Sequence, residues 1–557
     1  MKRPELNELT LTEKIAQLLM PNEYTVLQKC EISEETPRPK AEIAEFMSKY
    51  QYGSFWGSGN MLNRNANLAE SNVGLNANAS EYKQWLEVLQ SNVRIPMLVG
   101  VDCENGTNNM VADGTRTSVA ISIGAADDEE LTFELAAAVA REIKALGANW
   151  RWTPILDLHN RFGGGGIRVN SDNLDRISKL ARATIRGTQS ENVASTIKHF
   201  PGHDIYEFRD THFVETIITM PFDDWWNTQA KVFQDMINEG VDSVMVGHIA
   251  FPAVDDTKRN GKYIPATMSK KIVTGLLREK MGFKGVIITD GITMASLTSF
   301  CDYEDMLIGL INAGNDILLG VNPYDYEIIE KAVLDGRIPM SRIDESAERV
   351  LALKEKIGLF DDNRQEYKMS EESKKTVEID RKIAEKSITL LYDNLNILPL
   401  KKENIKNITI VCTSNFSGTI QEIEVMKKEF EARGAKVNII DHISTIEEVQ
   451  KLAEENDFIL YAAYVGPHRP LGMPSLHGSA MGTYFNAFSF GKEKSIGISM
   501  GYPYLCHDAM TGAGTFLNIY STSPETQKAF VKVLYGEIEP TTNSPVDLEM
   551  KLRYVYC

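Results

Sequence analysis

The stretch Gly285-Val286-Ile287-Ile288-Thr289-Asp290-Gly291 joins a run of apolar, β-branched residues to a carboxylate and a glycine turn. Such a run predicts a strand that is buried on both faces, as in a parallel sheet. Asp290 then stands at the carboxyl end of its strand, where the active sites of parallel barrels are assembled. The residues alone leave a second interpretation open, in which Asp290 caps a helix that begins near Ile292.

Short apolar runs of the same kind alternate with helix-period segments between residues 50 and 320. This rhythm is typical of parallel strands that are joined by crossover helices. Seven or eight such units predict an α/β fold of the (β/α)8, TIM-like barrel type. The predicted strands cover residues 53–56, 95–101, 152–156, 195–200, 243–249, 286–289 and 316–319.

A second α/β block begins near residue 400, after the Leu398-Pro399-Leu400 breaker. Its strand-like runs alternate with helical segments, a pattern that predicts a doubly wound αβα sandwich. We therefore expect a barrel domain over residues 1–370, a linker helix region over 371–399 and a C-terminal sandwich domain over 400–557. The predicted sandwich strands cover residues 408–412, 436–440, 458–464, 495–499 and 516–520.

The composition argues against several classes of protein. The 557 residues carry a net charge of −18, which disfavours binding to nucleic-acid phosphates and to anionic membrane surfaces. The six cysteines form no CxxC pair, and no stretch approaches the ~18 apolar residues of a membrane span. With no apolar signal segment at the N-terminus, we expect a cytoplasmic protein without nucleic-acid or membrane partners. The oligomeric state is not defined by the sequence, which is compatible with a homodimer.

Polar residues stand at the carboxyl ends of several predicted strands. These ends meet at one face of a parallel barrel, so we expect the side chains to form one site. No HExxH motif and no carboxylate cluster at ligand spacing accompanies them, so we expect neither a catalytic metal nor a cofactor. The strand-end residues are Asp102, Lys198, His199, His248 and Asp290.

The loop Asp210-Thr211-His212 places a carboxylate two residues from an imidazole. A carboxylate at this spacing can orient the ring and hold its tautomer for general acid–base work near neutral pH. On the residues alone, a solvated loop pair is the commoner explanation. His203 and His248 are interpreted as structural histidines at the barrel rim.

Several motifs resemble, in order and spacing, the signatures of glycoside hydrolase family 3. The resemblance extends over nearly the whole chain and implies a barrel followed by an α/β sandwich. The motifs are Val101-Asp102-Cys103-Glu104-Asn105-Gly106, Pro154-Ile155-Leu156-Asp157, Lys198-His199-Phe200-Pro201-Gly202-His203 and Lys284-Gly285-Val286-Ile287-Ile288-Thr289-Asp290-Gly291-Ile292-Thr293-Met294.

An Asp-x-His pair after the Lys-His-Phe-Pro-Gly-His stretch is similar to the β-N-acetylhexosaminidase branch of that family. The resemblance implies that Asp290 is the nucleophile, that His212 is the general acid/base and that Asp210 orients His212. It further implies a carbohydrate substrate whose hydroxyls are bound by Asp102, Arg168, Lys198 and His199, with Met294 also at the substrate site.

The chain departs from the family pattern at two places. After Asp102 the family reads Glu-Gly-Gly-Arg-Val-x-Arg, whereas this chain reads Glu104-Asn105-Gly106-Thr107-Asn108-Asn109-Met110 and lacks both arginines. Arg116 is a candidate to reach the same place. The segment between His203 and the Asp-x-His pair is also one residue longer than in the hexosaminidase branch, so the sugar pocket is expected to differ.

The leading hypothesis is a retaining, exo-acting β-glycosidase, specifically a β-N-acetylglucosaminidase or β-N-acetylhexosaminidase. A β-glycoside phosphorylase and a β-glucosidase or β-xylosidase of the same family are the enzymatic alternatives. A sugar-binding protein without turnover is the alternative of another class, and the two missing arginines are its main support. The sugar, the aglycone and the acceptor are not defined by the sequence.

Overall fold

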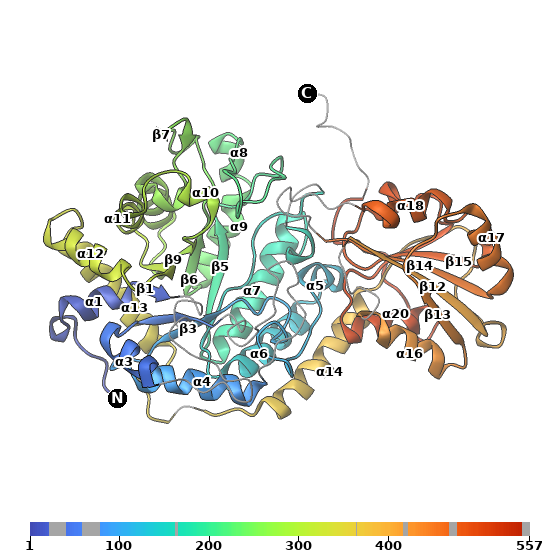
Figure 1. Ribbon diagram of the computed structural model, residues 1–557, viewed down its shortest axis with the longest axis horizontal. Coiled ribbons are helices and arrows are strands. Elements are labelled where there is room, and N and C mark those ends of the chain that lie inside the picture. The colour runs from blue at the N-terminus through green and yellow to red at the C-terminus, as the bar shows by residue number, and fades with distance from the viewer. Residues whose placement is uncertain are drawn as a thin grey trace. The chain divides into compact units, whose positions relative to one another are not determined.

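The computed structural model describes residues 1–21, 41–57, 78–161, 165–363, 365–415, 422–466 and 476–548. Within them, eight parallel strands form one sheet in the order β1-β10-β9-β6-β5-β4-β3-β2. The Gly53 N–H donates to the Ala16 carbonyl at 2.8 Å, and the Ser54 hydroxyl to the Leu19 carbonyl at 3.2 Å. These bonds bring the two end strands together, so the sheet is a nearly closed barrel (Figure 1).

The barrel strands alternate with helices along the chain, as the hydrophobic rhythm predicts. The strands are β1 (Leu19–Pro21), β2 (Ser54–Trp56), β3 (Leu98–Val101), β4 (Trp150–Arg151), β5 (Ala194–Phe200), β6 (Ser243–Val246), β9 (Val286–Gly291) and β10 (Ile317–Val321). A small hairpin of β7 (Lys258–Arg259) and β8 (Lys262–Tyr263) follows β6. The helices are α1 (Leu11–Gln17), α3 (Ala41–Tyr50), α4 (Ala79–Ser91), α5 (Ala120–Ala126), α6 (Glu129–Ala145), α7 (Leu174–Ser190), α8 (Phe222–Trp226), α9 (Gln229–Glu239), η5 (Lys271–Lys280), α10 (Ala295–Thr298), α11 (Tyr303–Ala313), α12 (Asp325–Leu334), α13 (Met340–Lys356) and α14 (Met369–Ser387).

Two barrel strands differ from the sequence prediction. β1 was not predicted because its three residues are too few to show a period. β4 lies at Trp150–Arg151, before the predicted residues 152–156, which pair with β5 only through an isolated bridge between Ile155 and Lys198. Pro154 explains the interruption, because proline has no N–H to donate to a ladder.

The amino end of β10 is fixed by a buried charge cluster. The carboxylate of Asp316, which is fully buried, lies 2.9 Å from Arg342 Nη2 and 3.0 Å from Arg349 Nη1, and it also pairs with Arg278. The arginines belong to α13 and η5, and Asp316 also accepts from the N–H of Ile287 in β9 at 2.9 Å. This cluster joins two strands to two helices at the end of the barrel opposite the predicted site.

The C-terminal sheet has the order β11-β16-β15-β14-β12-β13. Five strands are parallel, and β11, at one edge, is antiparallel to β16. β11 was not among the predicted strands and lies in the region 371–399 that was predicted as a linker. The strands are β11 (Thr389–Asp393), β12 (Asn407–Ser414), β13 (Lys436–Ile440), β14 (Phe458–Tyr464), β15 (Ser495–Ser499) and β16 (Thr515–Asn518). The helices are α16 (Glu424–Ala432), α17 (Ile446–Glu455), α18 (Gly478–Asn486), α19 (Leu505–Asp508) and α20 (Pro524–Leu534).

Successive residues of β12, an interior strand of this sheet, face two separate apolar cores. Ile410 packs in one core with Phe430 of α16 and Phe530 of α20. Val411 packs in the other with Val449 of α17. Helices therefore cover both faces of this sheet, as Figure 1 shows for α16 and α20 on one side and α17 and α18 on the other. The predicted fold class, a TIM-like barrel followed by an αβα sandwich, is confirmed.

Contacts divide the chain into two compact units that are not two consecutive pieces. The first contains Met1–Arg116, Thr132–Asp157 and Ala181–Thr376, and the second contains Thr117–Leu131, Leu158–Leu180 and Val377–Cys557. Segments that follow β3 and β4 thus belong to the second unit. In the part of the chain that the structure describes, every helix is too short or too polar to cross a bilayer.

Candidate active site

The predicted strand-end residues lie together at one end of the barrel, within the first unit. Lys198 and His199 lie near the carboxyl end of β5, and Asp290 lies near the carboxyl end of β9. Asp102 follows β3 directly, and His248 lies just beyond β6. The arrangement is the one that the strand pattern predicts, since the carboxyl ends of parallel strands meet at one face.

Lys198 holds two carboxylates at the end of β3. Its Nζ lies 2.9 Å from Asp102 Oδ1 and 2.9 Å from Glu104 Oε1, and the residue is only 2% exposed. A buried ammonium is stable only when it is paired and hydrogen-bonded. Because two carboxylates share one cation, their remaining oxygens are acceptors for donors such as sugar hydroxyls.

Asp290 is an ionised carboxylate that faces imidazoles. Its Oδ1 accepts from the Gly291 N–H at 2.7 Å. Burial alone would raise the pKa of Asp290, but the nearby rings of His199, His248 and His212 lower this pKa to about 2. The carboxylate is therefore charged at neutral pH. The alternative that Asp290 caps a helix is wrong, because α10 begins only at Ala295.

His248 is a buried histidine with both ring nitrogens hydrogen-bonded. Nδ1 lies 2.8 Å from the Thr267 hydroxyl, and Nε2 lies 2.9 Å from the carbonyl oxygen of Gly291. Burial lowers the pKa of His248. The prediction of a satisfied rim histidine is confirmed, and its contact with Gly291 supports the turn that carries Asp290.

Asp157 brings two further histidines together. Its Oδ2 lies 2.9 Å from His199 Nδ1, and its Oδ1 lies 3.1 Å from His203 Nδ1 and accepts from the His203 N–H at 3.0 Å. Burial opposes ionisation of Asp157, but the two histidines hold its pKa well below the usual range. These three residues have ligand atoms within 4.8 Å of one another, close enough for a metal ion. Their hydrogen bonds already account for this grouping.

Asp210 and His212 form the predicted dyad. Asp210 Oδ1 lies 2.6 Å from His212 Nδ1 and also accepts from the His212 N–H at 2.9 Å. The His212 side chain is 42% exposed and that of Asp210 is 13% exposed, so the ring is accessible while its partner is covered. The His212 carbonyl accepts from the Ala295 N–H at 3.0 Å, which joins the dyad loop to the segment after Asp290.

The loop after β3, where the family arginines are missing, folds back on itself. Gly106 and Arg116 form an antiparallel bridge, and the Thr107 N–H donates to the Thr115 carbonyl at 2.9 Å. The buried carboxylate of Glu142 in α6 accepts from the Thr107 hydroxyl at 2.5 Å and from the Thr115 hydroxyl at 2.8 Å. Arg116 is thereby brought back beside the start of the loop.

Arg151, at the end of β4, holds the same loop from the barrel side. Its Nε and Nη2 donate to the Cys103 carbonyl at 3.0 and 2.9 Å. Burial lowers the pKa of Arg151 to about 10, so the guanidinium is still charged at neutral pH. Cys103 has a left-handed backbone conformation with φ of 36°, which residues other than glycine rarely adopt. Arg151 thus fixes the turn between Asp102 and Glu104.

Two predicted substrate-binding residues have less direct support. Met294 is 8% exposed and its N–H donates to the Gly291 carbonyl at 3.1 Å, so it packs behind the Asp290 turn. Arg168 lies in the short helix η3 (Gly166–Arg168), in a segment of the second unit. Their roles in substrate binding stay predictions.

Asp157, Glu104 and Arg151 were not among the residues predicted to form the site, and His203 was interpreted as structural. Asp157 had a usable signal, because it follows an apolar run exactly as Asp102 does. Glu104 had only the family motif, and Arg151 had none. The role of this arginine can be recognised only when the structure shows its acceptor, the Cys103 carbonyl.

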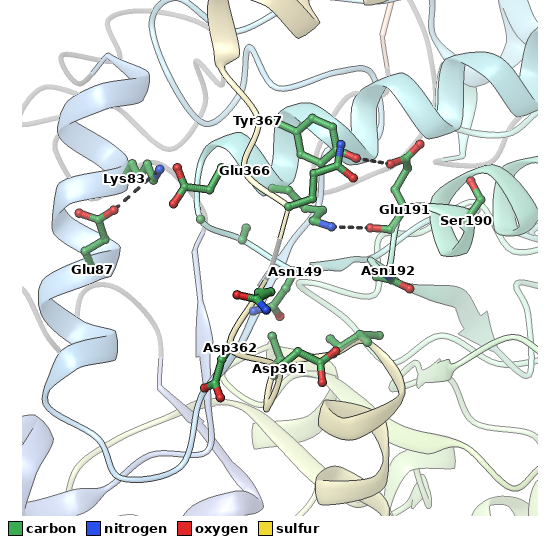
Figure 2. A pocket seen from close by; sticks show the side chains of 18 residues that line it. Lys83, Glu87, Asn149, Ser190, Glu191, Asn192, Asp361, Asp362, Glu366 and Tyr367 are labelled. Atoms are coloured by element: carbon green, nitrogen blue, oxygen red, sulfur yellow. Dashed lines mark hydrogen bonds and ion pairs between the residues drawn. The ribbon is translucent and has the colours of Figure 1, made fainter. Parts of the chain in front are cut away.

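A polar pocket of about 500 Å³ lies at the other end of the barrel, beside the amino ends of β4 and β5 (Figure 2). Glu191 lines it and accepts from the Tyr367 hydroxyl at 2.7 Å. Asn149 and Asn192, which precede the two strands, also line it. None of the predicted catalytic residues does. In parallel barrels this end supports stability, and the chemistry takes place at the other.

Known proteins resemble this chain over the barrel and beyond it. Residues 10–353 match the glycosyl hydrolase family 3 N-terminal domain. The β-N-acetylglucosaminidase/β-glucosidase of Cellulomonas fimi is 25% identical over 495 residues, which is 84% of this chain and 86% of that protein. The β-hexosaminidase A of Pseudoalteromonas piscicida is 30% identical over 300 residues, 50% of this chain and 47% of that protein.

Solved structures share the fold over the whole chain. A β-glucoside phosphorylase has a TM-score of 0.82 at 24% identity, covering 98% of this chain and 95% of that chain. A glycoside hydrolase family 3 β-N-acetylglucosaminidase from Paenibacillus sp. str. FPU-7 has a TM-score of 0.78 at 24% identity, covering 97% and 99%. At this identity the likeness establishes the two-part architecture.

A parallel barrel that gathers an ionised aspartate, a buried lysine and several histidines at the carboxyl ends of its strands has the usual placement of a barrel enzyme's active site. The family match covers more than half of the chain. This protein belongs to glycoside hydrolase family 3 and is a β-hexosaminidase-like glycosidase that acts on carbohydrates.

We expect Arg151→Met to lower activity with little effect on folding. The change removes both donors to the Cys103 carbonyl, so the turn that orients Asp102 is lost and kcat/KM on an aryl glycoside falls roughly tenfold. It also removes a buried cation, so the free energy of unfolding changes by only about 1 kcal/mol. All six tryptophans belong to the first unit, and their fluorescence in urea measures its unfolding.

Arg94→Met is the matched control, because Arg94 pairs with Glu13 at the surface and touches no site residue described above. It should leave kcat/KM unchanged. Wild-type kcat/KM in Arg151→Met would contradict the role assigned to Arg151.

Proposed function

We propose that this protein is a retaining, exo-acting β-N-acetylhexosaminidase that uses Asp290 as nucleophile and His212 as general acid/base. The observation that carries the proposal is the pairing of two groups in opposite roles. Asp290 is held ionised at the end of β9, and the Asp210–His212 dyad is hydrogen-bonded to the segment that follows it. A nucleophile and a proton donor are the two groups that retaining hydrolysis needs.

In the first step, Asp290 attacks the anomeric carbon while the bond to the leaving oxygen breaks. His212 transfers its Nε2 proton to that oxygen, so the aglycone leaves as a neutral alcohol and a glycosyl ester of Asp290 remains. In the second step, water attacks the anomeric carbon, Nε2 takes the proton of the water, and the carboxylate is released. The two inversions retain the anomeric configuration.

Asp210 makes the His212 ring suitable for both steps. Its carboxylate accepts the Nδ1 hydrogen, which leaves Nε2 as the atom that gains and loses the proton. The negative charge of Asp210 stabilises the imidazolium that donates in the first step. After donation the ring is neutral and its Nε2 lone pair is ready to accept from water.

The sugar-binding roles follow from the acceptors and donors at the barrel end. Asp102, with Glu104, offers carboxylate oxygens, and Lys198 and His199 offer polar atoms within the same group. Arg168 and Met294 complete the proposed substrate-binding set. N-acetylglucosamine is the proposed sugar because the relatives include proteins named β-N-acetylglucosaminidase and β-hexosaminidase.

Phosphate is the second acceptor to consider, because His212 is an uncharged imidazole when the acceptor arrives. A carboxylate base in its place would repel the phosphate dianion, whereas a neutral ring does not. The attacking phosphate oxygen would then form a glycosyl phosphate in place of the free sugar. We propose water as the acceptor and treat phosphate as the alternative.

A substrate panel tests the sugar and the acceptor together. We expect 4-nitrophenyl β-N-acetylglucosaminide to give the highest kcat/KM among the N-acetylglucosaminide, glucoside and xyloside, with free sugar as the product in both the presence and absence of phosphate. Product analysis by NMR measures this. A phosphate-dependent rate with glycosyl phosphate as product would establish the phosphorylase instead, and absence of turnover on all substrates would support a binding protein.

Asp290→Ala is expected to lower kcat on the best substrate by at least about a thousandfold, because no covalent intermediate can form. Added azide should restore part of the rate and yield the α-glycosyl azide, since a small anion fits where the carboxylate was. Asp256→Ala, at an exposed aspartate, is the control and should behave as wild type. Wild-type turnover in Asp290→Ala would show that the nucleophile is another residue.

His212→Ala is expected to slow substrates according to their leaving group. An aryl glycoside that leaves without protonation should lose only a few-fold in kcat/KM, whereas an alkyl glycoside should lose about a hundredfold or more. His442 provides the matched control, because its Nδ1 also lies 2.6 Å from an aspartate, Asp441, at the surface of the second unit. Equal losses on both substrates in His212→Ala would exclude the acid role.

A further inference from the structure

A hydrogen-bonded path leads from the predicted sugar-binding histidine into the dyad loop. Asp157 contacts His199 on one carboxylate oxygen and His203 on the other. His203 Nε2 lies 3.3 Å from the Thr211 hydroxyl, and that hydroxyl lies 2.9 Å from the Thr216 hydroxyl. The path therefore begins at the barrel strands and ends between the two members of the dyad.

The path has a definite polarity. An ionised carboxylate only accepts hydrogen bonds, so Asp157 requires a hydrogen on Nδ1 of both His199 and His203. When the His203 ring is neutral, Nε2 has a lone pair, which accepts from the Thr211 hydroxyl. The Thr211 oxygen in turn accepts from Thr216. Each group donates toward Asp157, and no step in the path places two donors or two acceptors face to face.

Burial strengthens the hydrogen bonds of this path. Asp157 is 5% exposed, Thr211 is 6% exposed and Thr216 is fully buried. Water competes little with hydrogen bonds in such surroundings, and an unpaired member would lose its solvation without replacement. The loop is thus tied to the barrel through Thr211, the residue between the two members of the dyad.

We propose that His203 is a positioning residue, which holds Thr211, and with it the acid/base dyad, at a fixed place relative to His199 through Asp157. The inference rests on the proposed role of the dyad. It adds that the group binding the sugar and the loop donating the proton are set by one shared carboxylate. A sugar seated on His199 is then in register with His212.

Thr211→Val and His203→Asn test the inference. Thr211→Val keeps the side-chain volume and has no hydroxyl, whereas His203→Asn keeps an N–H donor near the position of Nδ1 for Asp157 and has no atom at the position of Nε2. We expect each to lower kcat on an alkyl glycoside about tenfold, the effect of one lost hydrogen bond, and to change kcat on an aryl glycoside less than about twofold. KM should be nearly unchanged, and Thr211→Ser, which restores a hydroxyl, should recover the alkyl rate.

Thr219→Val is the matched control. The Thr219 hydroxyl donates to Asp204 Oδ2 at 2.8 Å, so it supports the same loop without belonging to the path. It should leave the alkyl-to-aryl rate ratio at the wild-type value. Thermal unfolding of each variant checks that it is folded.

The outcomes separate the inference from the proposed function. If His212→Ala shows the leaving-group effect but Thr211→Val and His203→Asn do not, the positioning role is wrong and the acid role stands. If His212→Ala shows none, the acid role itself fails. Loss of wild-type activity on chelation, with metal content lost in His203→Asn, would show that the histidines hold an ion and would overturn the proposed path.

Discussion

The cost of burying a charge without a partner determines how the active end of this barrel is built. A lone ion in a protein interior costs several kcal/mol, and it is tolerated only when hydrogen bonds and counter-charges replace its water. Lys198 meets this requirement with Asp102 and Glu104, and Asp157 meets it with His199 and His203. Each of these sets of ion pairs and hydrogen bonds orients the side chains that form it.

Much of the fold could be predicted, because its information is local. Apolar runs and helix periods along the chain reveal most strands and their parallel connections. The predictions that failed concern three strands. β1 is too short to have a period, Pro154 moves the ladder of β4 toward the preceding residues, and the antiparallel edge strand β11 was not predicted as a strand. Pairing direction and register depend on partners far away in the sequence.

The candidate site was predictable only in part, for the same reason. Four site residues could be recognised because they are polar residues at the ends of apolar strands. They are Asp102, Lys198, His199 and Asp290. The importance of Arg151 depends on a backbone carbonyl 48 residues away, which no pattern along the chain discloses. The importance of Glu142 depends likewise on hydroxyls of a loop that folds back on itself.

The dyad is built within three consecutive residues, whereas the nucleophile is part of a barrel strand. One loop carries the imidazole, the carboxylate that orients it and the backbone N–H that this carboxylate also binds. A loop of this kind can be replaced, lengthened or exchanged without dismantling the strand that carries Asp290. The proton donor is thus a local unit of the chain, and an exchanged loop would keep its place only if it preserved the contacts to His203 and to the Ala295 N–H.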